Sequence, residues 1–361
     1  MFHVLALGGD GIGPEVVACG LRLLEAIGEA EGIALAIEED LLHGKAWERY
    51  GTFCREETLI AAREADAVLV GAVGGTQWDG IRVPGGAEMQ DGLMRLRKGL
   101  DTYAGLRPAR AWAALAHLTP YRPEVLAGAD VMVLREMSGG AFFTDQRGVE
   151  TRQGRRVGYD LSLYGEDEVA RILHAGFQLA RQRRGRLCSA EKSNVMETYR
   201  LWRTVAGEIA AEYPDVAFEH MYADNCAYQL VRRPADFDVI VADNLFGDLL
   251  SDITGSIAGS LGMLPSACLH GLGSDAEPPR GIYEPVHGTA PDIAGQGIAN
   301  PIGTLLSVAL MFEHGLRRPD LARRIENAVT AVLEAGTRTP DIGGNATSLD
   351  VTDAVIAAAR A

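Results

Sequence analysis

Short apolar runs of the length of buried strands alternate with longer stretches patterned like helices, and this alternation restricts the fold more than any other feature. The runs Val4–Leu7 and Ala67–Val70 flank the amphipathic stretch that runs from Pro14 to about Gly32. This β-α-β rhythm predicts an α/β protein with a mostly parallel sheet covered by helices. The pattern further predicts strands at 35–37, 131–134, 186–190, 218–222 and 239–241, and helices at 56–64, 166–183 and 197–212.

The last third of the chain has a different character. Residues 301–314, 319–335 and 351–359 have the pattern of helices, with few strands between them. The stretch His270–Gly281 is rich in Gly, Pro and Ser and is predicted to be a loop. No linker clearly separates two independent domains, so if there are two lobes we expect the chain to cross between them more than once.

Composition and charge exclude several kinds of partner. The 361 residues carry a net charge of −15 with no basic stripe, which argues against nucleic acid and against an anionic membrane surface. An anionic substrate must then be captured by a local group of arginines. The five cysteines form no C-x-x-C motif, and the sequence begins without a basic, apolar leader and contains no long apolar span. These features predict reduced thiols and a cytoplasmic protein.

Two carboxylates follow a predicted buried strand. Asp248 and Asp252 come after the apolar run Val239–Ala242, on a helix that is predicted to begin near Phe246. Positions four apart lie on one face of a helix, so the two like charges are held side by side at the C-terminal end of a strand, where open α/β sheets bind ligands. A solvated acidic face is the simpler interpretation of an isolated pair, but here the flanking sequence favours a divalent metal such as Mg²⁺ or Mn²⁺.

Several cations and a further acid follow other strands and turns. Arg97, Arg107 and Arg135 would suit a substrate with two carboxylates if they converged, although each one alone is more typical of a surface. Lys192 follows the apolar stretch Leu187–Ala190; it is either an exposed helix-start lysine or, near a metal, a general base. Asp224 either opens a turn or adds a third carboxylate to the metal.

Two glycine-rich segments are candidates for nucleotide binding. Gly8–Glu15 follows the first strand and opens a helix, but it lacks the spacing of a dinucleotide fingerprint, so a tight strand-to-helix turn is an equal alternative. The stretch Glu284–Pro301 is predicted to be one long loop whose backbone N–H groups can wrap a nucleotide. An aspartate within it, Asp292, would bind ribose hydroxyls and repel a 2′-phosphate, which favours NAD over NADP.

Taken together, these segments resemble the β-decarboxylating dehydrogenases, the family of isocitrate, homoisocitrate, tartrate/D-malate and 3-isopropylmalate dehydrogenases. The resemblance spans almost the whole chain, and the motifs are most similar to those of the isopropylmalate branch. They are Gly9–Glu15, Leu96–Lys98, Leu106–Pro108, Arg135-Glu136, Asn244–Asp248 and Glu284–Gly288.

The resemblance implies an isopropylmalate dehydrogenase-like, two-lobed α/β fold with a large mixed, mostly parallel sheet, and not a true Rossmann fold. Residues 1–103 and 260–361 would form a discontinuous cofactor-binding lobe, and residues 104–259 a central lobe with the dimer interface and the metal site. It also implies a homodimer with shared active sites and NAD-dependent oxidation and decarboxylation of 3-isopropylmalate, in leucine biosynthesis. The metal would act as a Lewis acid as CO₂ leaves.

The resemblance also assigns residues to roles. Mg²⁺ or Mn²⁺ would be bound by Asp248, Asp252 and the partner subunit's Asp224, with the partner's Lys192 in proton transfer. The carboxylates of the 2-hydroxy dicarboxylate would be bound by Arg97, Arg107 and Arg135, and its branched group by Leu93, Met94 and Val195, near Gln90. The residues that would contact NAD are Gly75, Asn194, Glu284, His287, Gly288, Thr289, Ala290, Pro291, Asp292, Ile293 and Asn300.

Two positions depart from the family pattern. Where the family carries a catalytic tyrosine, this chain has Phe142, which has no hydroxyl and cannot donate a proton. Where isopropylmalate enzymes usually carry glutamate, it has Gln90. Three hypotheses therefore stay open: turnover of 3-isopropylmalate, the same chemistry on tartrate, D-malate or a malate with a bulkier alkyl or benzyl group, and a regulatory homologue that has lost catalysis.

Overall fold

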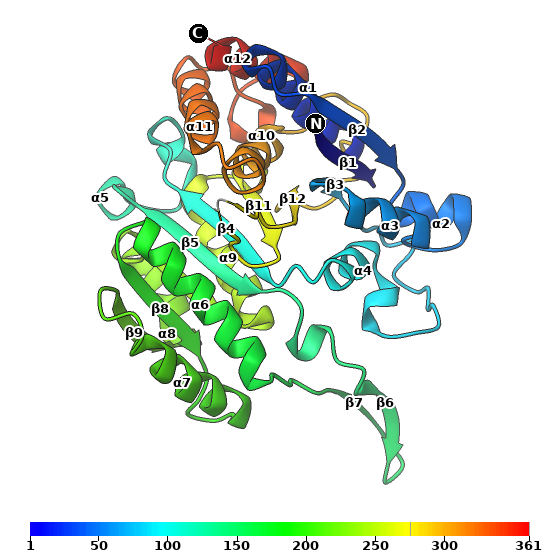
Figure 1. Cartoon of the computed structure of the whole chain (residues 1–361), viewed down its shortest axis with the longest axis vertical. Coiled ribbons are helices and arrows are strands. Elements are labelled where there is room, and N and C mark those ends of the chain that lie inside the picture. Colours follow the sequence, from blue (N-terminus) through cyan, green and yellow to red (C-terminus); the bar gives the residue numbers. More distant parts are fainter. Residues whose placement is uncertain (275, 361) are drawn as a thin grey trace.

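A ten-stranded mixed sheet forms the centre of the molecule, and helices cover both of its faces (Figure 1). The computed structural model describes residues 1–274 and 276–360. The order of strands across the sheet is β2-β1-β3-β12-β11-β4-β5-β10-β8-β9. The strands are β1 (Phe2–Gly9), β2 (Leu35–Asp40), β3 (Ala67–Ala72), β4 (Ala104–Arg110), β5 (Asp130–Glu136), β8 (Arg186–Glu191), β9 (Ala217–Tyr222), β10 (Val239–Ala242), β11 (Pro265–Leu269) and β12 (Gly281–Pro285).

The helices fill most of the connections between these strands. The α-helices are α1 (Gly13–Glu31), α2 (Gly44–Tyr50), α3 (Glu56–Glu64), α4 (Gly92–Gly99), α5 (Pro123–Leu126), α6 (Glu166–Gln182), α7 (Glu197–Ala210), α8 (Ala223–Arg232), α9 (Asn244–Ala258), α10 (Ile302–Leu310), α11 (Pro319–Glu334) and α12 (Ser348–Arg360). Residues Met311–Gly315 continue α10 as a π-helical turn. None of the helices described is both long and apolar enough to cross a membrane.

The sheet is parallel toward both edges and antiparallel at its centre. The pairings β12–β11, β11–β4 and β4–β5 are antiparallel, and the pairings on either side of them are parallel. A proline lies in the central strand β4, where it would normally remove a ladder hydrogen bond. Proline is tolerated at position 108 because β11 pairs with β4 only along Ala104–Leu106. The backbone nitrogen of Pro108 therefore faces the side of β4 that has no hydrogen-bonded strand beside it at this position.

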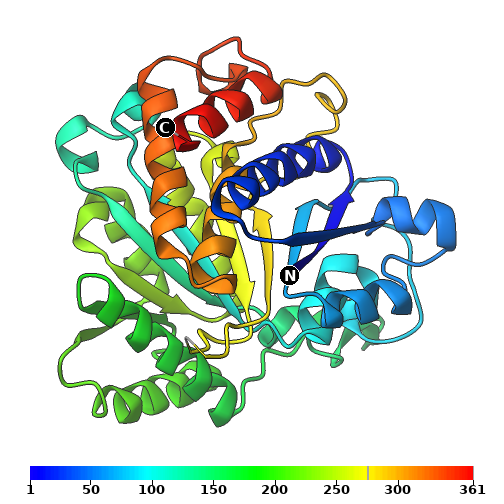
Figure 2. The same cartoon turned by 45° about the horizontal axis from the view of Figure 1, so that its top comes forward.

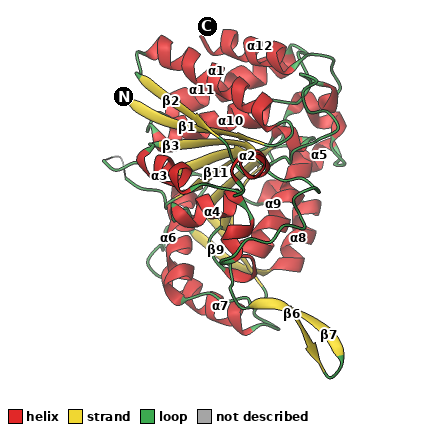
Figure 3. Ribbon diagram, turned by 90° about the vertical axis from the view of Figure 1, so that its right-hand side faces the viewer, coloured by secondary structure: helices red, strands yellow, loops and turns green. Residues whose placement is uncertain are grey.

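Segments distant in sequence come together at one end of the molecule. The N-terminal helix α1 packs beside α10 and α12, so the beginning and the end of the chain form one body, while the middle of the chain forms the other end (Figure 2). The hairpin β6 (Arg147–Arg152) and β7 (Arg155–Asp160) extends away from the rest of the middle segment (Figure 3). Its side chains are almost all exposed.

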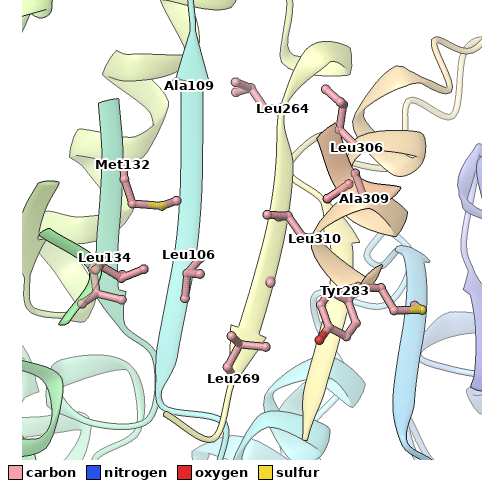
Figure 4. Packing of buried hydrophobic residues seen from close by; sticks show 14 of the residues in the cluster. Leu106, Ala109, Met132, Leu134, Leu264, Leu269, Tyr283, Leu306, Ala309 and Leu310 are labelled. Atoms are coloured by element: carbon pink, nitrogen blue, oxygen red, sulfur yellow. The ribbon is translucent and has the colours of Figure 1, made fainter. Parts of the chain in front are cut away.

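The two faces of the sheet are covered differently. On one face, which we call the covered face, a single apolar cluster runs from β1 to β10 under α1, α10, α11, α6 and α7. Figure 4 shows part of this cluster, with Leu106 on β4, Leu134 on β5 and Tyr283 on β12, and with Leu306 and Leu310 on α10. A hollow of about 200 Å³ beside Arg110, Glu313 and Glu326 is lined by residues of this layer.

The opposite face, the divided face, carries two separate clusters. One lies under α3 and α4 and contains Leu5, Leu7 and Val70. The other lies under α8 and α9 and contains Val133 and Ile240. Side chains alternate between faces along a strand, so Arg107 of β4 and Arg135 of β5 point to the divided face, between the two clusters. Charged groups therefore occupy the part of this face that apolar side chains leave uncovered.

Most predicted elements are confirmed, with shifts of a few residues at their ends. The mostly parallel α/β sheet is confirmed, and α3 spans the predicted 56–64. Three details were wrong. The helix that carries Asp248 begins at Asn244 and not near Phe246. Asp224 lies in the first turn of α8 and does not end a strand.

The third error concerns the long segment before α10. It is not all loop, because Glu284 and Pro285 are the last residues of β12. The predicted loop 270–281 connects β11 to β12, and within it Asp275 lies outside the described residues.

Candidate active site

The candidate site lies where the divided face carries charges instead of apolar side chains. Arg107 and Arg135 extend from β4 and β5 and are buried. Arg97 reaches the same place from α4, and Glu284 from the end of β12. Four residues from four different elements thus converge, and the sequence had predicted the arginines but not the role of the glutamate.

Glu284 pairs with Arg97 and not with Arg107. The Nη2 of Arg97 donates to Glu284 Oε1 at 2.5 Å. Burial alone would lower the pKa of Arg97, but the charge and hydrogen bond of Glu284, together with smaller contributions from other neighbours, leave this pKa above its usual value. For Arg107, burial dominates and lowers the pKa. Within the described residues the Nε atoms of Arg97 and Arg107 are buried without a hydrogen-bond partner. Buried guanidinium groups with unsatisfied N–H donors are suited to an anionic ligand with more than one carboxylate.

Arg135 is held from several sides. Its Nε and Nη2 donate to Asn244 Oδ1 at 3.0 and 2.7 Å, and its Nη1 pairs with Asp248. Burial and, to a smaller extent, the positive charge of Arg107 lower the pKa of Arg135 to about 10, and the group stays cationic at neutral pH. The ring of Phe142 lies 5.7 Å from its guanidinium carbon.

The two aspartates of α9 lie on one helix face, as the sequence predicted. The helix is capped by Asp243, whose carboxylate accepts from Phe246 N at 2.8 Å and from the Tyr199 hydroxyl at 2.7 Å. Burial raises the pKa of Asp252, and the charge of Asp248 raises it further. Two carboxylates that repel each other beside the site arginines fit a hard divalent cation, which would relieve that repulsion.

The third predicted metal ligand is not brought to the other two within one chain. Among residues 1–274 and 276–360, no group of three His, Cys, Asp or Glu residues is arranged to hold a metal ion. Asp224 instead accepts from Lys192 Nζ at 2.5 Å, and this hydrogen bond lowers the pKa of the carboxyl. The Asp224 side chain is 70% exposed, so it is available to another molecule.

The glycine-rich turn Gly8–Glu15 is hydrogen-bonded to the predicted cofactor loop and to two other segments. Asp10 is buried and accepts from the backbone N–H groups of Gly44, Lys45 and Gly74 at 3.0 to 3.2 Å. Glu15 accepts from Gly297 N and Ala299 N at 3.3 and 3.0 Å.

Gly11 makes the closest approach between this turn and the loop. A side chain there would lie 2.0 Å from the Thr289 carbonyl oxygen, and its φ of +56° also favours glycine. The turn therefore has a structural role in bracing the loop, in agreement with the strand-to-helix alternative.

The loop itself exposes groups suited to a nucleotide. Gly288, Pro291 and Asp292 are exposed, whereas Ile293 packs against Ile12 and Val16. His287 Nδ1 lies 2.9 Å from the Gly288 carbonyl, and its buried Nε2 has no partner within the described residues. Burial lowers the pKa of His287, so the ring is neutral at pH 7. An unpartnered ring nitrogen beside exposed backbone fits a polar ligand such as a dinucleotide.

Two residues predicted to contact ligands are already bonded inside the fold. Gln90 closes the segment before α4 by accepting from Val83 N at 3.0 Å and donating to Val83 O at 2.7 Å. The Asn300 side chain donates to Asp341 at 3.0 Å and accepts from Ile302 N at 3.0 Å. In this arrangement both side chains fix loops, so any contact with a ligand stays a prediction.

The remaining predicted residues divide into two places. Leu93 is buried and Met94 half-buried on α4, close to Arg97 along the helix. Gly75 is packed beside Trp78. Asn194 and Val195 lie apart from these, in the exposed turn after β8, and Val195 is 66% exposed.

Sequence reasoning missed three residues that organise the site. They are Asp10, Tyr164 and Asn244, and all are buried. Their contacts are long-range, as with the Tyr164 hydroxyl that accepts from Asn244 N at 3.0 Å across 80 residues. For Asn244 the sequence did contain a local signal, because this polar residue follows the apolar run of β10 and the helix cap Asp243.

The comparison with family models places nearly the whole chain in one family. Residues 3–356 match the model described as isocitrate/isopropylmalate dehydrogenase. A protein of Chromohalobacter salexigens named 3-isopropylmalate dehydrogenase is 49% identical over 362 residues, covering 99% of each chain. A protein of the same name from Xanthomonas oryzae is 48% identical and covers 99% of each chain. Another from Aquifex aeolicus is 47% identical and covers 94% of this chain and 91% of its own length.

Solved structures agree with the fold. An isocitrate dehydrogenase from Methylococcus capsulatus matches with a TM-score of 0.86 at 30% identity, covering all of both chains. A β-decarboxylating dehydrogenase from Thermococcus kodakarensis matches with a TM-score of 0.78 at 32% identity, covering 99% of this chain and 96% of that one.

Proposed function

This chain belongs to the isocitrate/isopropylmalate dehydrogenase family and is a decarboxylating dehydrogenase, and we propose that it converts (2R,3S)-3-isopropylmalate to 2-oxo-4-methylpentanoate. NAD⁺ would accept the hydride from C2, and CO₂ would leave from the neighbouring carbon. The reaction belongs to leucine biosynthesis, as the names of the relatives with 47% to 49% identity support.

The observation that carries this proposal is the convergence of three arginines beside a pair of aspartates. Arg107 and Arg135 are buried and the Arg97 side chain is 12% exposed, so three largely enclosed positive charges converge, and Asp248 lies directly against one of them. A substrate with two carboxylates matches the guanidinium groups. Its 2-hydroxyl would then lie toward Asp248 and Asp252, where a cation would be bound.

A branched apolar group finds a partial wall beside these arginines. Leu93 and Met94 come one turn before Arg97 on α4, so they are placed to contact a substituent at C3. Methionine adapts to several shapes, which keeps larger 3-alkyl groups open. The exposed Val195 of a second copy would complete the wall.

The residues of this chain also support a proton path at the hydroxyl. When bound, Mg²⁺ or Mn²⁺ supplies Lewis-acid stabilisation of the developing negative charge. Lys192 is paired with Asp224, and its side chain is 24% exposed. Facing the substrate, Lys192 would act in transfer of the hydroxyl proton, with Asp224 holding its ammonium group in place.

We propose that Lys192 and Asp224 act in the active site of a second copy of the chain. An apolar surface on α8 and α9 is well exposed, including Tyr228 (56%), Val231 (54%) and Leu249 (55%). A hollow of about 640 Å³ on this surface is lined by Lys192, Asp224 and Asp252 among apolar side chains. Exposed apolar patches of this kind are typical of protein interfaces, and a twofold dimer would bring Asp224 to the other copy's aspartates.

The cofactor and the lobes follow from the same arrangement. The loop of exposed backbone from Gly288 would hold the adenosine end of NAD, and Asp292 would favour NAD over NADP. The lobe boundaries would lie at 103/104, where β4 begins, and at 259/260, just after α9. Since all five cysteines are free thiols, we place the enzyme in a reducing compartment, the cytoplasm.

Steady-state assays of NADH formation test the proposal. The panel is 3-isopropylmalate, D-malate, tartrate and 3-benzylmalate, each with Mn²⁺ and with EDTA in its place. We expect the highest kcat/KM for 3-isopropylmalate and activity that disappears with EDTA.

Other outcomes of this panel point to the other hypotheses. A higher kcat/KM for another malate would replace the substrate but keep the chemistry. Binding without turnover of any of them would favour a regulatory homologue, the reading that Phe142 supports. Turnover that persists without metal would contradict the mechanism.

A further inference from the structure

We infer that Asn244 is a positioning residue that fixes the Arg135 guanidinium for the substrate carboxylate. This inference rests on the proposed function, because it assumes that Arg135 binds a carboxylate. Asn244 is buried, with 1% of its surface exposed, and it is the first residue of α9. It does not need to touch the substrate, and its effect would pass through Arg135.

The hydrogen bonds leave one particular edge of Arg135 available. A guanidinium has five N–H groups, one on Nε and two on each terminal nitrogen. Asn244 Oδ1 takes the Nε–H and one hydrogen of Nη2, at 3.0 and 2.7 Å, and Asp248 takes one hydrogen of Nη1. One N–H on each terminal nitrogen remains. These two form the end-on pair, which binds a carboxylate with two parallel hydrogen bonds, when Asp248 takes the Nη1 hydrogen that points back toward the Arg135 stem.

The neutral charge of the amide matters as much as its geometry. A carboxylate at position 244 could accept the same two hydrogen bonds, but it would also neutralise Arg135. Because Asp248 already lies against Arg135 and balances its charge, a second anion would make the group net negative and would repel a substrate carboxylate. An amide fixes the guanidinium without that competition.

Asn244 is itself fixed from the opposite side. Its Nδ2 donates to Gly139 O at 3.1 Å, and its backbone N–H donates to the Tyr164 hydroxyl at 3.0 Å. Tyr164 packs so closely on the segment Gly139-Gly140 that a side chain at Gly140 would lie 2.5 Å from its hydroxyl. Asn244 therefore ties Arg135 to the segment that leads into Phe142.

Close packing completes the arrangement on the aliphatic part of Arg135. A side chain at Gly247 would lie 2.7 Å from Arg135 Cγ. The stem is held by this contact and the head by Asn244, so the guanidinium has one position before any ligand arrives. Such pre-organisation reduces the ordering that substrate binding requires.

Calorimetric titration with 3-isopropylmalate, and with D-malate in parallel, tests the inference. Magnesium is present and NAD⁺ is left out, so no turnover occurs. We expect Asn244→Ala to weaken binding about tenfold, as is typical when a group that orients a ligand-binding residue is removed. Asn244→Asp, which keeps both accepted bonds, should weaken binding at least as much because of its charge. Asn327→Ala, an exposed asparagine on α11, is the control and should bind like the wild type.

A double-mutant cycle separates positioning from general damage. In an Arg135→Lys background there is no guanidinium for Asn244 to position. Adding Asn244→Ala should therefore change the dissociation constant for the substrate less than twofold. Equal tenfold losses in both backgrounds would overturn the inference, as would unchanged binding by both Asn244 variants.

A wild-type protein that binds neither dicarboxylate would instead overturn the proposed function, and the inference with it. The unfolding midpoint of each variant is measured alongside. If Asn244→Ala unfolds, the isosteric Asn244→Asp carries the test.

Discussion

The two faces of the central sheet are built on opposite principles, although the same strands form both. On the covered face, apolar side chains from β1 to β10 join in one cluster. On the divided face, two smaller clusters leave a strip that contains Arg107 and Arg135. The covered face supplies the apolar burial that holds the sheet together. That support allows the divided face to hold buried charges which, by themselves, would oppose folding.

Removal of Asp252, a proposed metal ligand, should abolish the function of the divided face without disturbing the fold. Asp252→Asn keeps the size of the side chain, and Asp252 is exposed, so the unfolding midpoint should stay near the wild-type value. Mn²⁺ affinity in the presence of 3-isopropylmalate should fall roughly 100-fold or more, since even groups that only orient metal ligands contribute 10–100-fold.

Titration of free Mn²⁺ by electron paramagnetic resonance measures this loss. Asp79→Asn is the matched control, because the carboxylate is exposed and has no side-chain hydrogen bond among the described residues. Unchanged Mn²⁺ affinity in Asp252→Asn would contradict the proposed site.

Neighbouring residues on β5 allow the two faces to be tested against each other. Leu134 is fully buried on the covered face, and Arg135 follows it on the divided face. Leu134→Ala should lower the free energy of unfolding by about 2–5 kcal/mol, with KM for the substrate nearly unchanged. Arg135→Lys should do the reverse and raise KM roughly 100-fold, because a lysine cannot supply the two parallel bonds. Denaturant unfolding and steady-state kinetics on both variants decide the matter. Similar changes in stability and KM for the two variants would remove the distinction between the faces.

Loss of the hydrogen bonds that Asp10 accepts from Gly44, Lys45 and Gly74, next to Gly75 of the predicted NAD site, should have an intermediate effect. In Asp10→Asn, an amide N–H₂ must face at least one of the backbone N–H groups that the carboxylate now accepts from. An unsatisfied buried donor costs about 1–3 kcal/mol. We expect KM for NAD⁺ to rise roughly tenfold while Mn²⁺ affinity stays the same. A rise in KM for the malate without a rise in KM for NAD⁺ would contradict this prediction, because it would place Asp10 near the malate and not near NAD⁺.

The substitution Phe142→Tyr should have the smallest effect and the opposite sign. The Phe142 ring is half-buried near Arg135, so a hydroxyl can be added with little repacking. A phenol at this position could donate the proton that the enolate needs, and turnover should rise a few-fold. Single-turnover and steady-state rates on 3-isopropylmalate measure the change. Unchanged or lower turnover would mean that another donor already serves this step.

The sequence was sufficient for features in which neighbouring residues carry the information. The spacing of Asp248 and Asp252 puts them on one helix face, and the alternation along β5 puts Arg135 opposite Leu134. Helices such as α3 and α6 have strong periodic patterns and were predicted within a residue or so.

Features that depend on distant partners could not be predicted. The strand β4 contains Pro108 and two arginines, so its sequence does not have the apolar pattern of a central strand. Its central place follows only from its pairing with β5 and β11. Gln90 has the chemistry of a substrate contact, but the structure uses it to close the segment from Val83. Asn244 joins Arg135 to Gly139 across more than 100 residues, as the separations of 109 and 105 show.

A crystal structure with Mn²⁺ and 3-isopropylmalate tests the central claim most directly, namely that the charged strip of the divided face is the catalytic site. We predict a manganese peak bound by Asp248, Asp252 and Asp224 of a second copy, with the substrate carboxylates on Arg97, Arg107 and Arg135. Manganese bound elsewhere would contradict the account. So would an ordered substrate bound outside the strip, with Asp248 and Arg135 still paired to each other.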